Sequence, residues 1–349
     1  MLLCDHYYFG FSLLAGGVLL ARRFLPRGEP RPPGLLRNLA LFAVASAATC
    51  GPIVGSLVAS DARDPLVGSH DARAFSLDLL APFVPGSHWR FASLTEGIWA
   101  RLGGGALENS VHLGSPVLFL LGWAIVRRRE LRLEGARAWW TIALLAFALA
   151  LGPGLRLAGK EIVSGVLPYA ALEAVLPALR LGGTPVRWIV LVQLCAALIA
   201  AAAFRDLWSR GPRWRVLGLV LLAILAFEIL PKPLPRTSPE FPGYVRALKN
   251  MPADGAVLDL FAGPGRALYH QIEHGKPLAF GYISRLPTSA VRRLERLAAA
   301  ASTGNARALC REFGVRYLVV AASVRDRIGS IAEVVYADEE AAIGRVKCP

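Results

Sequence analysis

Residues 186–204 read VRWIVLVQLCAALIAAAAF, and Arg187 is the only charged residue in this run. A helix needs roughly 20 predominantly apolar residues to cross a hydrocarbon core of about 30 Å. We interpret this run, and two others at 39–58 and 216–230, as apolar enough to predict transmembrane helices by themselves.

Three shorter apolar runs lie at 7–21, 111–126 and 138–151. A run of about 10–14 apolar residues can equally be the buried core helix of a soluble protein. Arginine clusters at their ends favour membrane spans here. The sequence therefore predicts an α-helical polytopic membrane protein with about six transmembrane helices.

Arginines are concentrated in three short connections between the predicted helices. They are Arg22, Arg23, Arg27, Arg31 and Arg37 in the first, Arg127, Arg128, Arg129, Arg132 and Arg137 in the second, and Arg205, Arg210, Arg213 and Arg215 in the third. Short basic connections lie on the cytoplasmic side of a membrane. The net charge of +14 thus indicates membrane orientation and contact with anionic lipid rather than binding of nucleic acid.

This orientation places loops 60–110 and 154–187, and everything after Leu230, on the external face. In a bacterium-like cell the predicted location is the inner, cytoplasmic membrane, with the C-terminal part in the periplasm or outside. The N-terminus is external too, yet Met1 to His6 lacks the basic region of a signal peptide. We therefore expect an upstream portion with an odd number of spans.

The two external loops are too long to be simple connections. Residues 60–110 are amphipathic and rich in aromatic residues, which predicts a segment at the outer bilayer surface. Residues 160–181 are apolar but contain Pro168 and Pro177, and proline breaks the helical hydrogen-bond ladder. We predict an interfacial or re-entrant segment there.

Residues 231–349 have the composition of a small soluble domain, which begins after a proline-rich exit at 231–242. Periodicity predicts a small α/β domain on the external side. Helices are expected at 244–250, 267–273, 289–300 and 305–313, and strands at 256–261, 316–321, 332–336 and 341–346.

The string from Asp259 to Gly265 resembles the first motif of class I S-adenosylmethionine methyltransferases. Such glycine motifs need their βαβ context. The next expected strand, 277–283, is followed by Ser284 and Arg285 rather than by the acidic residue that would hold the ribose. We predict a plain strand and turn without S-adenosylmethionine.

Other metal and disulfide signals in the tail are weak. His270 and His274 share one helix face, but no third ligand is evident, so we expect a structural polar patch and no metal. The five cysteines form no metal-like pattern. A bond between Cys310 and Cys348 is allowed on an oxidising exterior, although spacing cannot establish it.

Four residues of the external loops are candidates for substrate binding: Asp78, Glu108, Arg180 and Arg187. Arginine binds phosphate through two parallel hydrogen bonds, and carboxylates can act as bases. Arg180 and Arg187 flank a Gly-Gly-Thr-Pro turn and are our candidates for a lipid phosphate. Ordinary interfacial arginines and solvated loop acids are the alternative interpretation.

Several strings together carry a family resemblance. They are FSLDLLAPFVP at 75–85, ENSVHLG at 108–114, GGTPVRW at 182–188, YHQIEHGKP at 269–277 and GYISR at 281–285. The pattern resembles the carboxy-terminal part of bacterial polytopic proteins of the GT-C glycosyltransferase superfamily.

The resemblance implies transfer of a sugar from a polyprenyl-phosphate donor to an acceptor on the external face. In that family the catalytic acid usually lies in a first external loop near the N-terminus, which has no counterpart before the first span here. The catalytic residues are therefore unknown, as are the protein partner and the need for a divalent metal. A non-catalytic membrane scaffold or assembly protein, and a transporter, are the alternatives.

Overall fold

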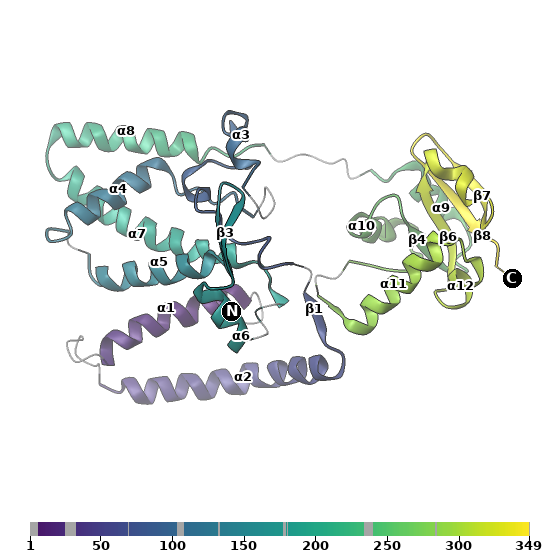
Figure 1. The fold of residues 1–349 in the computed structure, drawn as a ribbon, viewed down its shortest axis with the longest axis horizontal. Helices are drawn as coiled ribbons and strands as arrows, with labels where there is room; N and C mark the ends of the chain where they lie inside the picture. Colours follow the sequence, from purple (N-terminus) through teal and green to yellow (C-terminus); the bar gives the residue numbers. More distant parts are fainter. Residues whose placement is uncertain are drawn as a thin grey trace. The chain divides into compact units, whose positions relative to one another are not determined.

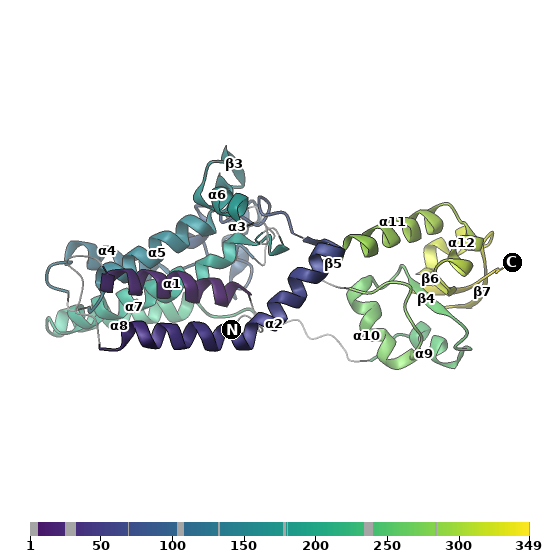
Figure 2. The ribbon, with the colours of Figure 1, turned by 90° about the horizontal axis from the view of Figure 1, so that it is seen from below.

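The computed structural model of the 349-residue chain describes residues 6–24, 33–68, 70–102, 108–131, 133–176, 179, 181–233, 240–282 and 285–348 (Figures 1 and 2). Contacts divide the chain into two compact units. The first comprises Met1–Ala59 and Gly68–Leu234, and the second comprises Ser60–Val67 and Pro235–Pro349. The larger break therefore falls four residues after the predicted boundary at 230.

The first unit is mainly helical, and a helix is present at each of the six apolar runs. These are α1 (His6–Phe24), α2 (Leu35–Arg63), α4 (Ser115–Val126), α5 (Ala136–Ala150), α7 (Ile189–Trp208) and α8 (Pro212–Glu228), with a 3-10 turn, η4 (Pro185–Trp188), leading into α7. The last residues of α2 are counted with the second unit.

The predicted six-span polytopic membrane fold is wrong. In the described part of the chain, only two helical segments, Leu35–Arg63 and Pro185–Trp208, are long and apolar enough to cross a membrane. Helices α4, α5 and α8 have 12, 15 and 17 residues. At 1.5 Å per residue these reach only about 18, 23 and 26 Å, short of a hydrocarbon core of about 30 Å. Helix α1 has 19 residues but ends in two arginines.

Helix α7 is the centre of the first unit. It buries nine residues, among them Ala196, Ala200 and Ala203 on one stripe. Helices α4 and α5 pack against it, α8 packs against both α4 and α7, and α1 packs against α5. Alanines at spacings of three and four let neighbouring backbones approach closely. In both ribbon views these helices run roughly alongside one another (Figures 1 and 2).

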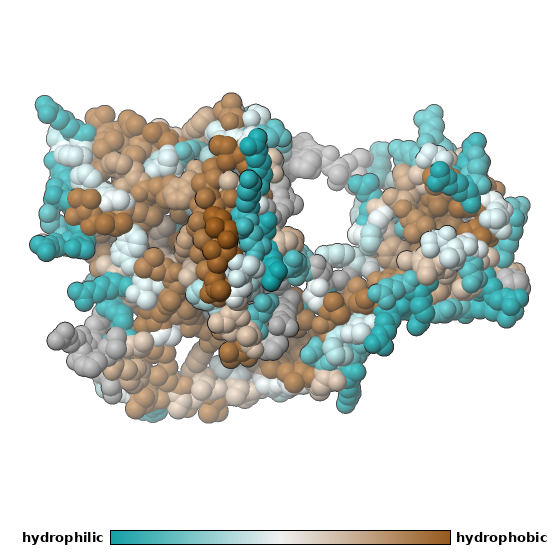
Figure 3. Space-filling view, in the orientation of Figure 1, coloured by the Kyte–Doolittle hydropathy of each residue, from teal (hydrophilic) through white to brown (hydrophobic). Residues whose placement is uncertain are grey.

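Many apolar side chains of the first unit are exposed. Helix α2 buries none of its 29 residues, and Leu41, Phe42 and Val44 are each more than 60% exposed. Helix α8 exposes Val216 and Leu219 to a similar degree. Figure 3 shows hydrophobic residues spread along α2 and over α4 and α8. Contiguous apolar surface of this kind marks contact with a membrane or another protein.

The predicted re-entrant segment has a different structure. Residues 154–164 form a hairpin of β2 (Gly154–Leu157) and β3 (Lys160–Ser164), followed by the short helix α6 (Pro168–Val175). The described residues of loop 70–113 form turns and three short helical segments. These segments are η1 (Ala81–Phe83), η2 (Ala92–Leu94) and α3 (Glu96–Trp99). The prediction failed because it treated the proline as a break in a helix and missed the strand pairing before it.

The second unit combines helices with a four-stranded sheet. Its elements are β1 (Leu66–Gly68), α9 (Gly243–Asn250), β4 (Ala256–Asp259), α10 (Pro264–His274), β5 (Arg285–Pro287), α11 (Thr288–Ser302), α12 (Ala306–Arg311), β6 (Val315–Ala321), η5 (Ala322–Ile328), β7 (Ala332–Ala337) and β8 (Ala341–Val346). Helix α10 begins three residues before the predicted start because Pro264 occupies its first turn, where a missing N–H costs nothing.

The strand order of the main sheet is β4-β6-β8-β7. Strands β4 and β6 are parallel, and the remaining pairs are antiparallel. Leu278 adds an isolated parallel bridge to β4. Alternate residues of β6 face opposite sides: Tyr317 and Val319 pack with α9, whereas Leu318 and Val320 pack with α11 and α12. The sheet is thus covered by helices on both faces.

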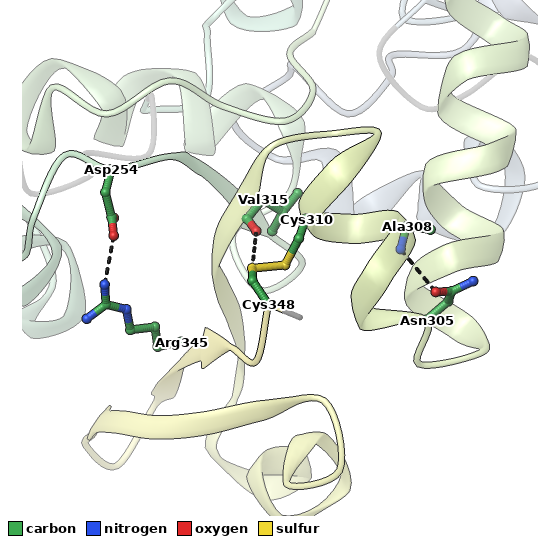
Figure 4. Close-up of a disulfide and its surroundings, with 7 residues drawn as sticks. All are labelled: Asp254, Asn305, Ala308, Cys310, Val315, Arg345 and Cys348. Carbon is green, nitrogen blue, oxygen red and sulfur yellow. Dashed lines mark hydrogen bonds and ion pairs between the residues drawn. A yellow bond between two sulfur atoms is a disulfide. The ribbon is translucent and has the colours of Figure 1, made fainter.

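A disulfide joins Cys310, at the end of α12, to Cys348, just after β8 (Figure 4). The sulfur of Cys348 also lies 4.0 Å from the carbonyl oxygen of Val315. The bond fixes the end of an interior strand to the helix that covers it. The sequence allowed this pairing but did not establish it.

We expect loss of this bond to destabilise the second unit. The bond closes a sequence separation of 38 residues, for which chain entropy predicts about 4 kcal/mol. Cys310→Ser and Cys348→Ser should therefore speed amide exchange in β6 and β8 by several hundred-fold. Cys50→Ser, a change to a free cysteine of α2, is the control and should have no such effect. Unchanged exchange in both disulfide variants would contradict the pairing.

Candidate functional site

The two ends of the helices in the first unit differ in character. At one end, Arg210 after α7 binds Glu130 after α4, at 3.2 Å. A Cβ atom on Gly135 would lie 2.8 Å from a guanidinium nitrogen of Arg22, so the first arginine-rich connection lies at this end too. The described residues of loops 70–113 and 154–187 lie at the other end, and the predicted substrate-binding residues belong to those loops in the sequence.

Glu108 and Arg187 form an ion pair at this second end. Arg187 Nη2 donates to Glu108 Oε1 at 2.8 Å, and its Nε donates to Oε2 at 3.4 Å. The guanidinium carbon of Arg187 lies 5.3 Å from the centre of the Tyr7 ring. The two side chains are 41% and 28% exposed, so the pair is open to solvent or ligand on one side.

Tyr7 joins α1 to the turn that carries Arg187. The backbone N–H of Thr184 donates to the Tyr7 hydroxyl at 3.0 Å. Gly183, with φ of 58°, packs so closely that an added Cβ would meet the His70 carbonyl oxygen at 2.2 Å. The Gly-Gly-Thr-Pro turn therefore has little freedom, and it holds Arg187 in one place.

Asp78 is buried and has a different set of partners. Its carboxylate accepts N–H bonds from Leu80 at 2.9 Å, Ala158 at 3.1 Å and Gly159 at 2.7 Å. The last two belong to the tight turn between β2 and β3. Asp78 thus fixes the hairpin to loop 70–113 and does not contribute to the Glu108–Arg187 pair.

The turn that Asp78 holds is a strained one. Ala158 has φ of 54° and Gly159 has φ of 80°, the pattern of a two-residue hairpin turn. An alanine in this conformation costs about 1–2 kcal/mol. A Cβ on Gly159 would lie 1.9 Å from the Arg101 carbonyl oxygen, so only glycine fits there. The carboxylate of Asp78 compensates for the unfavourable alanine.

The fourth predicted site residue, Arg180, lies outside the described residues. The structure therefore brings together two of the four, Glu108 and Arg187, and shows that a third, Asp78, holds the hairpin. Sequence reasoning did not select Tyr7, which contacts the site from α1. A tyrosine near the start of an apolar helix gives no signal of its own in one sequence.

Another acid of this end is engaged with a helix terminus. Glu228, near the end of α8, accepts from the backbone N–H of Ser115 at 2.7 Å and from its hydroxyl at 2.6 Å. Ser115 begins α4, where free N–H groups favour a negative charge. Glu228 therefore links α8 to the start of α4.

The polar patch of the second unit is buried. Asp259 ends β4, and its Oδ1 accepts from the N–H groups of Phe261 and Ala262 at 3.0 and 2.8 Å. The Tyr244 hydroxyl lies 3.3 Å from Asp259 Oδ2 and 2.9 Å from His270 Nδ1. Burial raises the pKa of Tyr244, and the Asp259 charge adds to this effect. The hydroxyl stays protonated and can donate to only one of its two neighbours.

His274 is held as a neutral ring. Its Nδ1 accepts from the backbone N–H of Lys276 at 3.0 Å, so the ring proton must lie on Nε2. Burial lowers the pKa of His274 to about 4, and the Lys276 charge acts in the same direction. Burial also lowers the pKa of His270. Both histidines use Nδ1 for protein contacts.

No group of three His, Cys, Asp or Glu side chains that could hold a metal ion occurs among the residues described. His270 and His274 face Tyr244 and Lys276 as given above.

These observations define a helical unit, with the Glu108–Arg187 pair at one end and the arginine-rich connections at the other, and a small α/β unit in the same chain. Residues 1–229 match the family described as a domain of unknown function, DUF6311. Because the match covers more than half of the chain, the protein belongs to this family. The match ends at the end of α8, so the larger part of the α/β unit, from 235 onward, lies beyond it. Comparisons with curated proteins and with solved structures gave no match.

The Asp78 contacts predict a specific loss of local stability. Asp78→Ala removes the charged acceptor of the partly buried N–H groups of Ala158 and Gly159, and each hydrogen bond to a charged group contributes about 1.5–3 kcal/mol. We expect amide exchange across β2 and β3 to rise by about 100-fold. Ala158→Asn should slow that exchange, because asparagine tolerates positive φ. Asp71→Ala, which removes only an exposed contact to the Arg73 N–H, is the control. Unchanged exchange in Asp78→Ala would contradict this assignment.

The buried His274 predicts acid sensitivity of the second unit. Its folded pKa of about 4 lies below the unfolded value of 6.5, so the unfolded chain binds more protons between these values. Stability is therefore complete above about pH 6.5 and falls as the pH drops toward 4, by up to about 3 kcal/mol. His274→Asn keeps an acceptor for the Lys276 N–H but cannot titrate. Amide exchange in α10, corrected for the intrinsic pH dependence, should rise in acid for the wild type and much less for this variant.

Proposed function

We propose that this protein is a membrane protein that binds a polyprenyl-phosphate-linked sugar at the Glu108–Arg187 pair, as the donor in glycosyl transfer. The placement of Arg187 carries the proposal. A guanidinium held by a neighbouring carboxylate and an aromatic ring presents its donors in a fixed fork, which suits phosphate. The GT-C resemblance supplies the donor class.

Membrane placement is supported by the apolar surface of the first unit. Helix α2 and the Pro185–Trp208 segment have the length and composition of spans, and α2 buries no residue. The arginine-rich connections lie at one end of the helices, as expected for a cytoplasmic side. We infer that the Glu108–Arg187 end faces outward in a bacterial inner membrane. The disulfide of the second unit supports an oxidising, external location for that unit.

Glu108 has a defined part in this proposal. The carboxylate occupies the position at Arg187 that a phosphate would take, since both bind a guanidinium through two oxygens. Binding of the lipid phosphate then replaces Glu108 as the partner of Arg187. The Glu108 carboxylate is released beside the phosphate and the attached sugar. We assign no catalytic base among the described residues.

A non-catalytic scaffold is the second candidate, and one observation favours it. Asp78 and Glu228, two acids of the outward end, are engaged in holding the hairpin and the start of α4. Carboxylates that fix the structure are poor candidates for proton transfer. A scaffold would bind the lipid or a protein at this end without turning it over.

If phosphate displaces Glu108 from Arg187, the Arg187→Ala and Glu108→Gln variants should change the affinity for polyprenyl phosphate in opposite directions. With polyprenyl monophosphate in phosphatidylcholine nanodiscs, Arg187→Ala should weaken binding by about 30-fold, the effect of about 2 kcal/mol in charge-assisted hydrogen bonds. Arg187→Lys should fall between, because it lacks the fork. Glu108→Gln should tighten binding, because the competing carboxylate is gone.

Arg90→Ala, a change to an exposed arginine in loop 70–113, is the matched control and should bind normally. A purely structural ion pair would give weaker folding and no gain of affinity in Glu108→Gln, which would overturn the proposed site. Incubation with a labelled polyprenyl-phosphate sugar then separates the two candidates. Transfer of the labelled sugar from the lipid phosphate to an acceptor hydroxyl or to water, lost in Arg187→Ala, supports the transferase, and binding without such transfer supports the scaffold.

A further inference from the structure

The opposite, arginine-rich end of the first unit contains a groove that no part of the proposed function uses. Its volume is about 660 Å³, and it lies where α4 ends and α5 begins. Three arginines line it together with apolar side chains and an indole: Arg128, Arg129, Arg137, Leu131, Leu133 and Trp140. The groove thus combines three positively charged side chains with an apolar floor.

The arginines of this end fall into two groups. Arg210 is bound to Asp206 through Nε at 3.0 Å and to Glu130 at 3.2 Å, and Arg127 also binds Glu130. These contacts engage Asp206 and Glu130, while Glu134, a third acid of this end, lines an adjacent hollow. Arg128, Arg129 and Arg137 are exposed and have no acidic partner within the described ranges. The groove therefore holds three exposed arginines, and no acid is among its described lining residues.

A second hollow, of about 860 Å³, shares Leu131 and Leu133 with the groove. Leu198, Ala201 and Ala202 of α7 form its apolar part, and Glu134 and Arg205 also line it. Next to the groove, α4 exposes 57% of Ile125 and 80% of Val126. Apolar surface therefore continues from the basic groove onto the helices. Of the two hollows, only the second has an acid, Glu134, among its described lining residues.

The geometry points to a binding site for an anionic glycerophospholipid, with its phosphodiester in the groove against Arg128, Arg129 and Arg137. Guanidinium groups pair with phosphate oxygens through two hydrogen bonds, and an indole is favoured at headgroup depth. The acyl chains lie on the exposed apolar surface of α4 and in the second hollow. Net charge selects against zwitterionic headgroups, whose cationic group would face the three arginines. This inference rests on the proposed membrane location but not on glycosyl transfer.

Retention of lipid by the full chain tests this site. The detergent-solubilised protein is titrated with phosphatidylglycerol or phosphatidylcholine, and bound lipid is counted by native mass spectrometry. Each arginine near an anionic lipid surface contributes about 5-fold in affinity. The triple change Arg128→Gln, Arg129→Gln and Arg137→Gln should therefore weaken phosphatidylglycerol binding by about 100-fold and leave phosphatidylcholine binding unchanged.

Arg213→Gln is the matched control, because Arg213 is exposed at the start of α8 and does not line the groove. Glycerol phosphate, which has the headgroup phosphate but no acyl chains, should compete poorly. Equal competition by glycerol phosphate would mean a soluble anion site and overturn the lipid assignment. Equal retention of the two phospholipids, or an unaffected triple variant, would overturn the site. Binding of polyprenyl phosphate at Arg187 is measured separately, so failure here leaves the proposed function untouched.

Discussion

Close packing around α7 is the constraint on which the first unit depends. Its buried stripe of alanines, with Cys195 and Ile199, brings α4 and α5 near enough to shield it. A protein interior is packed as densely as an organic crystal, so larger residues on this stripe would force the neighbouring helices apart. This packing therefore fixes the positions of Arg187, which lies just before α7, and of Asp206, near the end of α7.

The same packing explains which predictions from the sequence succeeded and which failed. Apolar runs predict where helices form, because helices of a protein core and helices that face lipid both contain such runs. They do not distinguish a span from a core helix when the run is short. Helices α4 and α5 are short because Gly114 and Gly135 precede them and the following turns end them. Val111 and Leu113, which the predicted span included, lie outside α4. The predicted span at 111–126 was therefore too long, whereas the run at 138–151 coincides closely with α5, a helix too short to cross a membrane.

The candidate site shows a similar limit. The pairing of Glu108 with Arg187 joins residues from distant loops, and no local pattern encodes it. Asp78 was selected as a substrate-binding residue of an external loop, yet it is buried beneath the β2–β3 turn. One sequence signal was available: the alternating run Leu155, Arg156, Leu157 before Ala158 and Gly159 is typical of a hairpin, although it does not indicate that Asp78 binds the turn. In the second unit, periodicity located most elements within a few residues, but strand order depends on pairings that a sequence alone does not reveal.

Strand β8 follows β4, β6 and β7 in the sequence, but it lies inside the sheet between β6 and β7. Strand β7 pairs with β8 and has no other partner in the described sheet, and β6 would keep one edge open without it. Until residue 346 has been synthesised, one side of β6 is unpaired and β7 has nothing to pair with. The nascent second unit must therefore pass through a stage with exposed strand edges, the state in which chains are most prone to pair with the wrong partner. Folding of this unit is a late event, completed only when β8 inserts and the chain beyond it is tied down at α12.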